Sequence, residues 1–90
     1  MTKEEFQRQV NFGRYPKYTY EQIKEGTPEK DCVSLICTES DNVFIGKYEH
    51  NKWKQARITS APNQKIYYDE MTKNVIYWTD GEPKDVLTPQ

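Results

Sequence analysis

The chain has 90 residues, of which 34% are hydrophobic, 30% are charged and 13% are aromatic. A chain of this length fits a single domain over residues 1–90, and its aromatic content argues against disorder. Thirteen lysines and arginines against fourteen aspartates and glutamates give a net charge of -1. This balance removes the simplest electrostatic reason for binding nucleic acid or an anionic membrane.

The sequence offers no membrane-spanning or secretory segment. No apolar run approaches the roughly 20 residues that a helix needs to cross a bilayer. The polar start, Met1-Thr-Lys-Glu-Glu, does not provide the apolar core of a signal peptide. We therefore expect a cytoplasmic protein that does not bind a membrane.

The two cysteines, Cys32 and Cys37, lie five residues apart in one expected strand. Their side chains should point to opposite faces and lie roughly 16 Å apart, since a strand rises ~3.3 Å per residue. This separation prevents a disulfide between them and a shared metal ion. The single histidine, His50, completes no zinc ligand set, so we expect no cofactor and no metal.

The first 26 residues have helical signals. Thr2 and Glu5 have the spacing of a capping box, and Phe6 with Val10 form an apolar pair one turn apart. These signals predict a short helix over Thr2–Asn11. Thr19 with Gln22 repeats the capping spacing, and Gly26 provides a stop, so we expect a second helical turn over Tyr20–Glu25.

From residue 31 to residue 79 the pattern changes to short β-like runs separated by turn residues. The sequence predicts an α+β domain in which the helical segments pack on an antiparallel sheet of four or five strands, as a meander or a small half-barrel. The link Thr59–Gln64 is the longest and should cross to another edge. Residues 80–90 form a polar tail that Val86 and Leu87 attach to the domain. The expected strands are Cys32–Thr38, Val43–His50, Trp53–Ile58, Lys65–Asp69 and Asn74–Thr79.

Two aromatic dipeptides, Tyr67-Tyr68 and Tyr77-Trp78, lie in the last two expected strands. We expect these strands to pair as a hairpin, with Tyr68 opposite Tyr77 and Tyr67 opposite Trp78. Successive side chains of a strand point to opposite faces, so both faces of the hairpin carry large rings. The helix can cover one face through Phe6 and Val10. Either loops cover the other face, or it is a partner-binding surface formed by Tyr67, Tyr68, Tyr77 and Trp78.

A cluster of positive charges offers a different interpretation. Lys47, Lys54 and Arg57 lie near Trp53 in the middle strands, as in a surface that stacks bases and contacts phosphates. Glu49 lies among them, and strand alternation sends Lys54 and Arg57 to opposite faces. A solvated strand surface is the competing explanation.

Catalytic signals are absent from the pattern. His50 has no neighbouring nucleophile in sequence, and the four glycines form no phosphate-binding loop. Asp69, Glu70 and Asp80 could pair as acid and base, but chance carboxylate pairs are common in so charged a chain. We do not expect an enzyme.

Several motifs between Thr27 and Pro83 resemble a family of small phage and prophage proteins of unassigned function. The chain differs from that family in its long segment from Ile58 to Asn74 and in the absence of a proline-rich ending directly after Trp78. The resemblance implies a phage origin and a small β fold, and it brings no site residues. Its motifs are Pro28-Glu-Lys-Asp-Cys-Val-Ser-Leu-Ile-Cys, Phe44-Ile-Gly-Lys-Tyr, Lys52-Trp53 and Val75-Ile-Tyr-Trp.

Small size, near-zero net charge and surplus aromatic surface favour a non-catalytic protein-binding module. The resemblance implies that this module is phage-encoded and inhibits or modulates a host protein, such as a defence component. Two alternatives remain open. The protein could bind nucleic acid or nucleotides through the sheet aromatics, or it could form a homodimer through a strand edge or the aromatic face.

Overall fold

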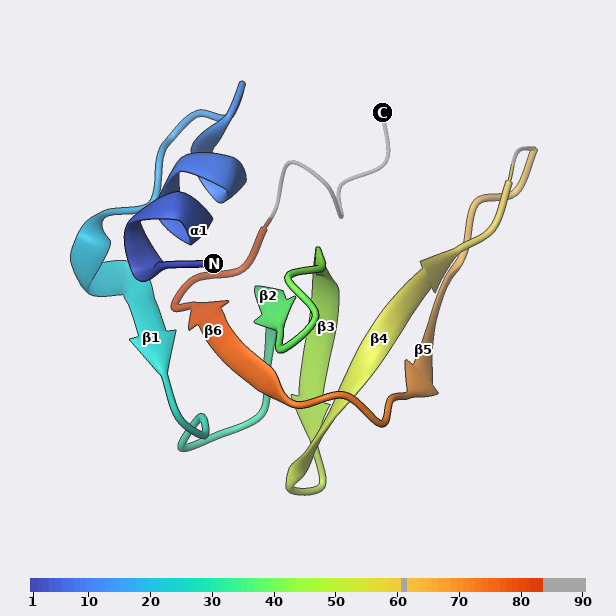
Figure 1. Ribbon diagram of the computed structural model, residues 1–90. Coiled ribbons are helices and arrows are strands. Elements are labelled where there is room, and N and C mark those ends of the chain that lie inside the picture. The colour runs from blue at the N-terminus through green and yellow to red at the C-terminus, as the bar shows by residue number, and fades with distance from the viewer. Residues whose placement is uncertain (61, 84–90) are drawn as a thin grey trace.

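The computed structural model describes residues 1–60 and 62–83, which fold as one α-helix and one six-stranded antiparallel sheet (Figure 1). The α+β class is confirmed, with more strands than the four or five predicted. Val86 and Leu87, expected to attach the tail, lie outside the described residues. The elements are α1 (Lys3–Asn11), the 3-10 turn η1 (Tyr20–Gln22), β1 (Ile23–Glu25), β2 (Cys32–Thr38), β3 (Val43–Glu49), β4 (Lys52–Ile58), β5 (Ile66–Glu70) and β6 (Val75–Thr79).

The strand order is β1-β6-β2-β3-β4-β5. The predicted meander is confirmed for β2 to β4, and β5 also pairs with its neighbour in sequence, β4. The chain then returns to the other side of β2, where Ile36 pairs with Trp78 and Cys37 with Tyr77. The sheet is so curled that the short link from Met71 to Asn74 carries the chain from β5 to β6 (Figure 1).

Two predictions about connections are therefore wrong. The link Met71–Asn74 is a crossover, not a hairpin turn, and the link Thr59–Gln64 joins the paired strands β4 and β5. The reason lies in β2, which is buried along most of its length. Buried backbone groups need hydrogen-bond partners on both sides of a strand, and β6 supplies them on the side that β3 leaves open.

The second helical turn is only partly present. The capping box forms, with the Thr19 N–H donating to Gln22 Oε1 at 2.8 Å, but the helical geometry ends at Gln22. Residues Ile23–Glu25 are the edge strand β1, in which Ile23 pairs with Thr79. The prediction of helix over these three residues is wrong, because pairing with the open edge of β6 satisfies more backbone groups than one further helical turn would.

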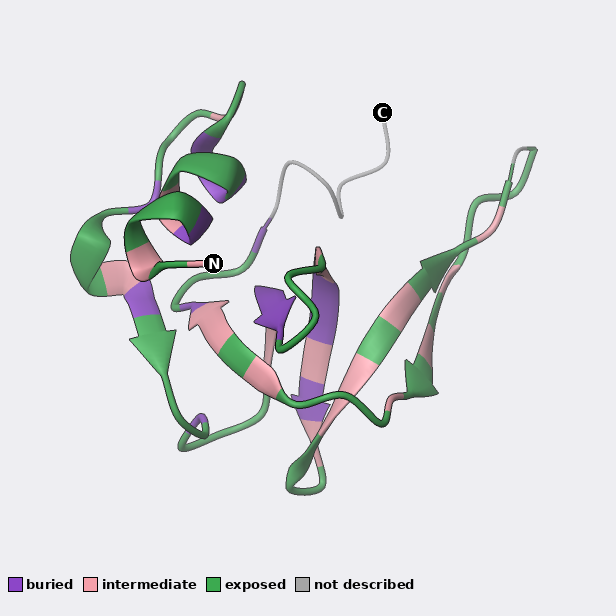
Figure 2. Ribbon diagram, viewed as in Figure 1, coloured by how far each residue is buried: buried purple, intermediate pink, exposed green. Residues whose placement is uncertain are grey.

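Helix α1 covers one face of the sheet. The Thr2 hydroxyl caps it by accepting from the Glu5 N–H at 3.1 Å, as the sequence predicts. Phe6 and Val10 are buried against the apolar side chains of β2 and β3, and the Phe6 ring stacks on Tyr77 with centroids 5.9 Å apart. This contact fixes α1 over the half of the sheet that contains β6 and β2 (Figure 2).

The opposite face of the sheet holds a second apolar group. The strand register places Ile36, Tyr48, Trp53 and Trp78 on this face. Ile36 and Tyr48 are buried, the Tyr48 and Trp53 rings meet edge to face at 5.3 Å, and Trp53 lies 6.4 Å from Trp78. Because Trp53 and Trp78 come from β4 and β6, their contact depends on the curl of the sheet.

Gly46 lies at the point where this second group packs most tightly. A Cβ atom at Gly46 would lie 2.5 Å from Cδ1 of the fully buried Ile36 and 3.2 Å from the Lys54 carbonyl oxygen.

We predict that Gly46→Ala lowers the free energy of unfolding, measured in urea, by about 1–3 kcal/mol, because Ile36 has no free space to move into. Since Ile36→Val removes Cδ1, Gly46→Ala combined with Ile36→Val should cost less than the sum of the two single changes. Simple additivity would contradict this packing.

Candidate protein-binding surfaces

The four aromatic residues predicted to form a binding surface do not lie together. The hairpin expected between them is wrong, because β5 pairs with β4 while β6 pairs with β1 and β2. Tyr68 lies opposite Ala56, and Tyr77 lies opposite Cys37. Three strands separate β5 from β6 in the sheet, so the two aromatic dipeptides belong to different parts of the molecule.

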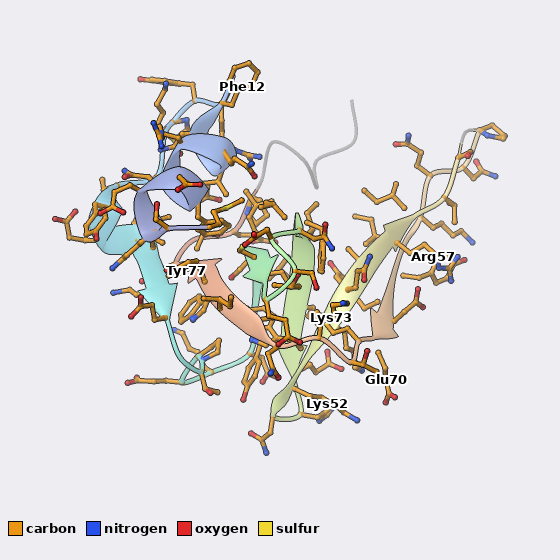
Figure 3. All side chains as sticks on the ribbon, in the orientation of Figure 1. Phe12, Lys52, Arg57, Glu70, Lys73 and Tyr77 are labelled. Carbon is orange, nitrogen blue, oxygen red and sulfur yellow. The ribbon has the colours of Figure 1, made fainter. Side chains whose placement is uncertain are left out.

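Tyr77 and Trp78 serve the fold. Tyr77 lies under α1 beside Phe6, and partial burial raises the pKa of its hydroxyl (Figure 3). Trp78 points to the opposite face, where its indole N–H donates to the Gly26 carbonyl oxygen at 3.0 Å. Each ring is half-buried and is held by a defined contact within the chain.

Tyr67 and Tyr68 lie at the far end of the sheet, on opposite faces of β5. The Arg57 guanidinium lies 5.0 Å from the Tyr67 ring centroid, and the Lys47 ammonium lies 5.2 Å from that of Tyr68. Both are cation–π contacts. Tyr67 remains 44% exposed. Tyr67 therefore stays available for a partner, whereas Tyr68 is half-buried, as Tyr77 and Trp78 are.

The positive charges considered for nucleic acid are compensated within the sheet. The Glu49 carboxylate lies 2.8 Å from the Lys47 ammonium and 3.6 Å from that of Lys54. The hydrogen bond from Lys47 is the main cause of the lowered pKa of Glu49. Arg57 pairs with Asp69 at 2.9 Å, and this bond raises the pKa of the guanidinium. With Trp53 packed between Tyr48 and Trp78, neither a free basic patch nor an open stacking ring forms at these four residues.

The most exposed aromatic side chains are two that the sequence analysis did not select. Phe12 is 91% exposed and Tyr15 is 90% exposed, in the segment that follows α1. Phe12 projects from the end of the helix away from the sheet (Figure 3). We call Phe12–Lys17 the aromatic loop. Phe12 directly precedes Gly13 and Tyr15 directly precedes Pro16, so the sequence marks a turn here, but it does not show that the two rings are exposed.

The aromatic loop is fixed at both ends by hydrogen bonds. Buried Asn11 bridges to Tyr18 twice: its Nδ2 donates to the Tyr18 carbonyl oxygen at 2.9 Å, and its Oδ1 accepts from the Tyr18 N–H at 2.8 Å. The Arg14 Nε donates to the Val10 carbonyl oxygen at 2.6 Å. Gly13 has a φ of 69°, which an L side chain rarely adopts. The two exposed rings are thus presented on an ordered backbone.

Basic side chains surround the two rings. Arg8 and Lys17 lie beside Phe12 in one shallow hollow, and Arg14 and Lys17 lie beside Tyr15 in another. Glu82 is the one acidic residue that lines either hollow among the described residues. Among the described residues, the charged side chains that line the two hollows are therefore mainly basic, although the chain as a whole is nearly neutral.

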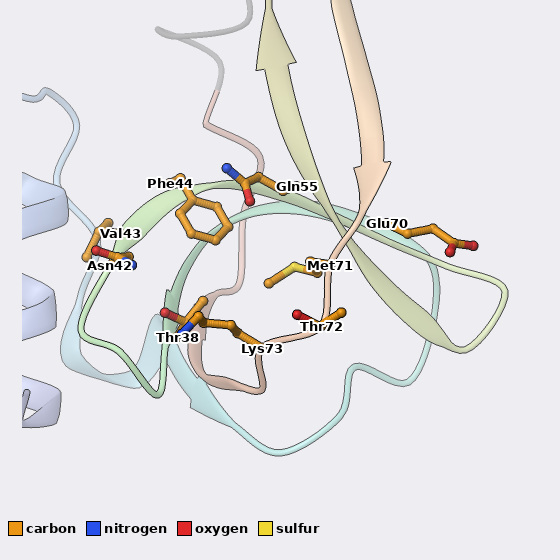
Figure 4. Close-up of a pocket in the computed structure, with 9 residues that line it drawn as sticks. All are labelled: Thr38, Asn42, Val43, Phe44, Gln55, Glu70, Met71, Thr72 and Lys73. Atoms are coloured by element: carbon orange, nitrogen blue, oxygen red, sulfur yellow. The ribbon is translucent and has the colours of Figure 1, made fainter.

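A further hollow lies where the β5–β6 link passes the turn between β2 and β3 (Figure 4). Phe44 and Met71 supply its apolar side chains, and Gln55 and Lys73 are among its polar ones. The Lys73 ammonium donates to the Ser40 hydroxyl at 2.8 Å.

Comparison with protein-family models, curated proteins and solved structures finds no match to this chain. Over residues 1–60 and 62–83, no three potential metal ligands of the His, Cys, Asp or Glu type gather at one place. In the same residues, no helix has the length and apolar character that crossing a bilayer requires. Cys32 and Cys37 are free thiols.

The role of Asn11 in holding the aromatic loop can be tested directly. We predict that Asn11→Ala lowers the free energy of unfolding by about 1–3 kcal/mol, because it leaves the buried Tyr18 N–H without its acceptor. The Tyr18 amide should also exchange with solvent faster. Gln9→Ala, an amide-to-alanine change on the exposed side of α1, is the matched control and should change stability by less than about 0.5 kcal/mol. Unchanged exchange at Tyr18 in Asn11→Ala would contradict this role.

Proposed function

We propose that the protein is a non-catalytic module that binds another protein through the aromatic loop. The observation that carries this proposal is the near-complete exposure of Phe12 and Tyr15 on a backbone fixed by Asn11. Large aromatic side chains supply most of the energy of many interfaces, and an ordered loop loses little entropy when it binds. Exposing two such rings gives the isolated domain no packing benefit.

The charges around the loop specify the kind of partner. Arg8 and Lys17 would favour a protein surface with an apolar pocket and an acidic rim. Such a surface would accept the rings and pair with the cations around them. The resemblance to phage and prophage proteins supports a host protein as the partner, inhibited or modulated in the host cytoplasm.

Tyr67 and Tyr68 remain candidate contacts at the other end of the sheet. Because they lie at the opposite end of the molecule from the aromatic loop, we do not expect one small partner to contact both regions. A nucleic-acid function through Lys47, Lys54, Arg57 and Trp53 gains no support from the geometry, because three of these residues are in ion pairs and the fourth is packed. We therefore do not adopt it.

An affinity capture from host lysate, with and without nuclease, tests the proposal. We predict that Phe12→Ser with Tyr15→Ser weakens capture of the partner at least about tenfold, because each ring is expected to be an interface anchor. Since both side chains are exposed, the free energy of unfolding should change by less than about 0.5 kcal/mol per substitution. A partner protein should be recovered equally with and without nuclease.

Two control variants make this experiment specific. Tyr20→Ser alters a tyrosine that is 43% exposed outside the loop and should leave capture unchanged. Tyr67→Ser with Tyr68→Ser reports whether the far end of the sheet takes part. Loss of capture only in the Tyr67 and Tyr68 variant would overturn the assignment to the aromatic loop, and recovery that requires intact nucleic acid would overturn protein binding.

A further inference from the structure

Strand β5 has one side of its backbone without a partner among the described strands. It pairs with β4 alone and ends the sheet (Figure 1). The Thr59 N–H donates to the Lys65 carbonyl oxygen at 2.9 Å, so the backbone groups of residue 65 point toward β4. In an antiparallel strand the backbone N–H and C=O groups of successive residues point to alternate sides. The backbone groups of Tyr67 and Asp69 therefore also point toward β4. The groups of Ile66, Tyr68 and Glu70 point outward.

Three of the devices that protect a free edge, namely proline, lysine and a β-bulge, are missing from β5. Its five residues contain no proline and no lysine, and its register with β4 runs without a bulge. The two acidic residues at its end are already paired, Asp69 with Arg57 at 2.9 Å and Glu70 with Lys52 at 3.1 Å. These pairs reduce the charge repulsion that would otherwise keep a second strand away.

The residues around Tyr67 are complementary to the same residues of a second copy that runs antiparallel to the first. Lys65 lies two positions before Tyr67, and Asp69 lies two positions after it. Ile66 and Tyr68, both partly buried and largely apolar, flank it directly. The Lys65 ammonium has no ion-pair partner within the described part of the chain, whereas Lys52 and Lys54 of β4 each have one.

We infer that two copies of the chain associate through β5, antiparallel and centred on Tyr67. This inference concerns a surface distinct from the aromatic loop and goes beyond the proposed function. In this register Tyr67 lies opposite Tyr67 of the second copy, Ile66 lies opposite its Tyr68, and Lys65 lies opposite its Asp69. The outward backbone groups of Ile66 and Tyr68 in one copy bond to those of Tyr68 and Ile66 in the other.

The neighbouring registers fit less well. Centring on Tyr68 would place Ile66 opposite Glu70 and Tyr67 opposite Asp69, so that apolar side chains would face carboxylates across the junction. Centring on Ile66 would leave Asp69 opposite Asn63 in the loop. Only the register centred on Tyr67 pairs opposite charges and apolar side chains at once, and such cross-strand pairs stabilise a sheet.

The dimer joins the two sheets into one and continues each face across the junction. Ile58, Ile66 and Tyr68 share one face of β4 and β5, so the same group from the second copy lies beside them. Ile66 and Tyr68 are the side chains that this contact covers directly, because Ile58 on β4 lies one strand further from the junction. The contact involves one short strand from each copy, so we expect a weak dimer that forms between micromolar and millimolar concentration.

Sedimentation equilibrium of the full chain over that concentration range tests the inference. The wild type should rise from the monomer mass toward twice that mass. Lys65→Asp, which leaves the Arg57–Asp69 pair intact, places two carboxylates together at both ends of the junction and should weaken association about tenfold or more. Asp69→Lys should weaken it similarly, and mixing the two variants should restore it, because every charge then faces its opposite. Thermal melting confirms that each variant is folded.

Cysteine cross-linking tests the register independently of the charge variants. In a Cys32→Ser background, Tyr67→Cys should form a disulfide-linked dimer under mild oxidation, since directly opposed residues in a non-hydrogen-bonded pair lie within disulfide range. Tyr20→Cys, at a site of similar exposure on α1's side of the molecule, should not form this linked dimer.

A constant monomer mass up to millimolar concentration would overturn the dimer. Association that Lys65→Asp leaves unchanged would overturn this edge as its site, and neither result bears on the aromatic loop.

Discussion

The pairing of β6 with β2 is the contact on which the other features of this molecule depend. It supplies hydrogen-bond partners for the backbone on the second side of β2, the most buried strand. It also requires the sheet to curl until the Met71–Asn74 link can join β5 to β6. The same pairing places Tyr77 under α1 and Trp78 beside Trp53 on the opposite face. It also takes β6 away from β5, which leaves β5 at the end of the sheet with one side open.

Local structure was predictable from the sequence because its causes are local. Thr2, Glu5, Phe6 and Val10 specify the start of α1 and its apolar side through contacts within two turns. Runs of β-branched and aromatic residues located the strands from β2 to β6 within a few positions. Ile23–Glu25 was predicted as helix because its three residues carry a capping signal just before them, and only a distant strand, β6, makes them extended.

The order of the strands was not predictable, because alternation tells which face a side chain occupies and not which strand lies beside it. Tyr67-Tyr68 and Tyr77-Trp78 are alike in sequence, and a four-residue link between them is typical of a hairpin. The two dipeptides lie apart because the backbone of β2 needs a second neighbouring strand, and β6 is that strand. The aromatic loop was missed for a related reason: Phe12 and Tyr15 look like core residues, and their exposure depends on where α1 ends against the sheet.

The aromatic residues thus have different roles. Phe6, Tyr48, Trp53, Tyr77 and Trp78 hold the two faces of a curled sheet, while Phe12 and Tyr15 project from an ordered loop at one end and Tyr67 lies on an open edge at the other. Opposite ends of one small domain can then serve two contacts. One end would bind a different protein, and the other would bind a second copy of the same chain.

The most direct test of this arrangement is a nuclear Overhauser spectrum of the isotopically labelled protein, examined for contacts between strand backbones. We predict cross-peaks between Ile36 and Trp78 and between Cys37 and Tyr77, together with ring contacts from Trp53 to Trp78. Backbone cross-peaks between Tyr68 and Tyr77 would instead show a hairpin of β5 with β6. That result would close the edge of β5 and contradict the fold from which both proposed surfaces follow.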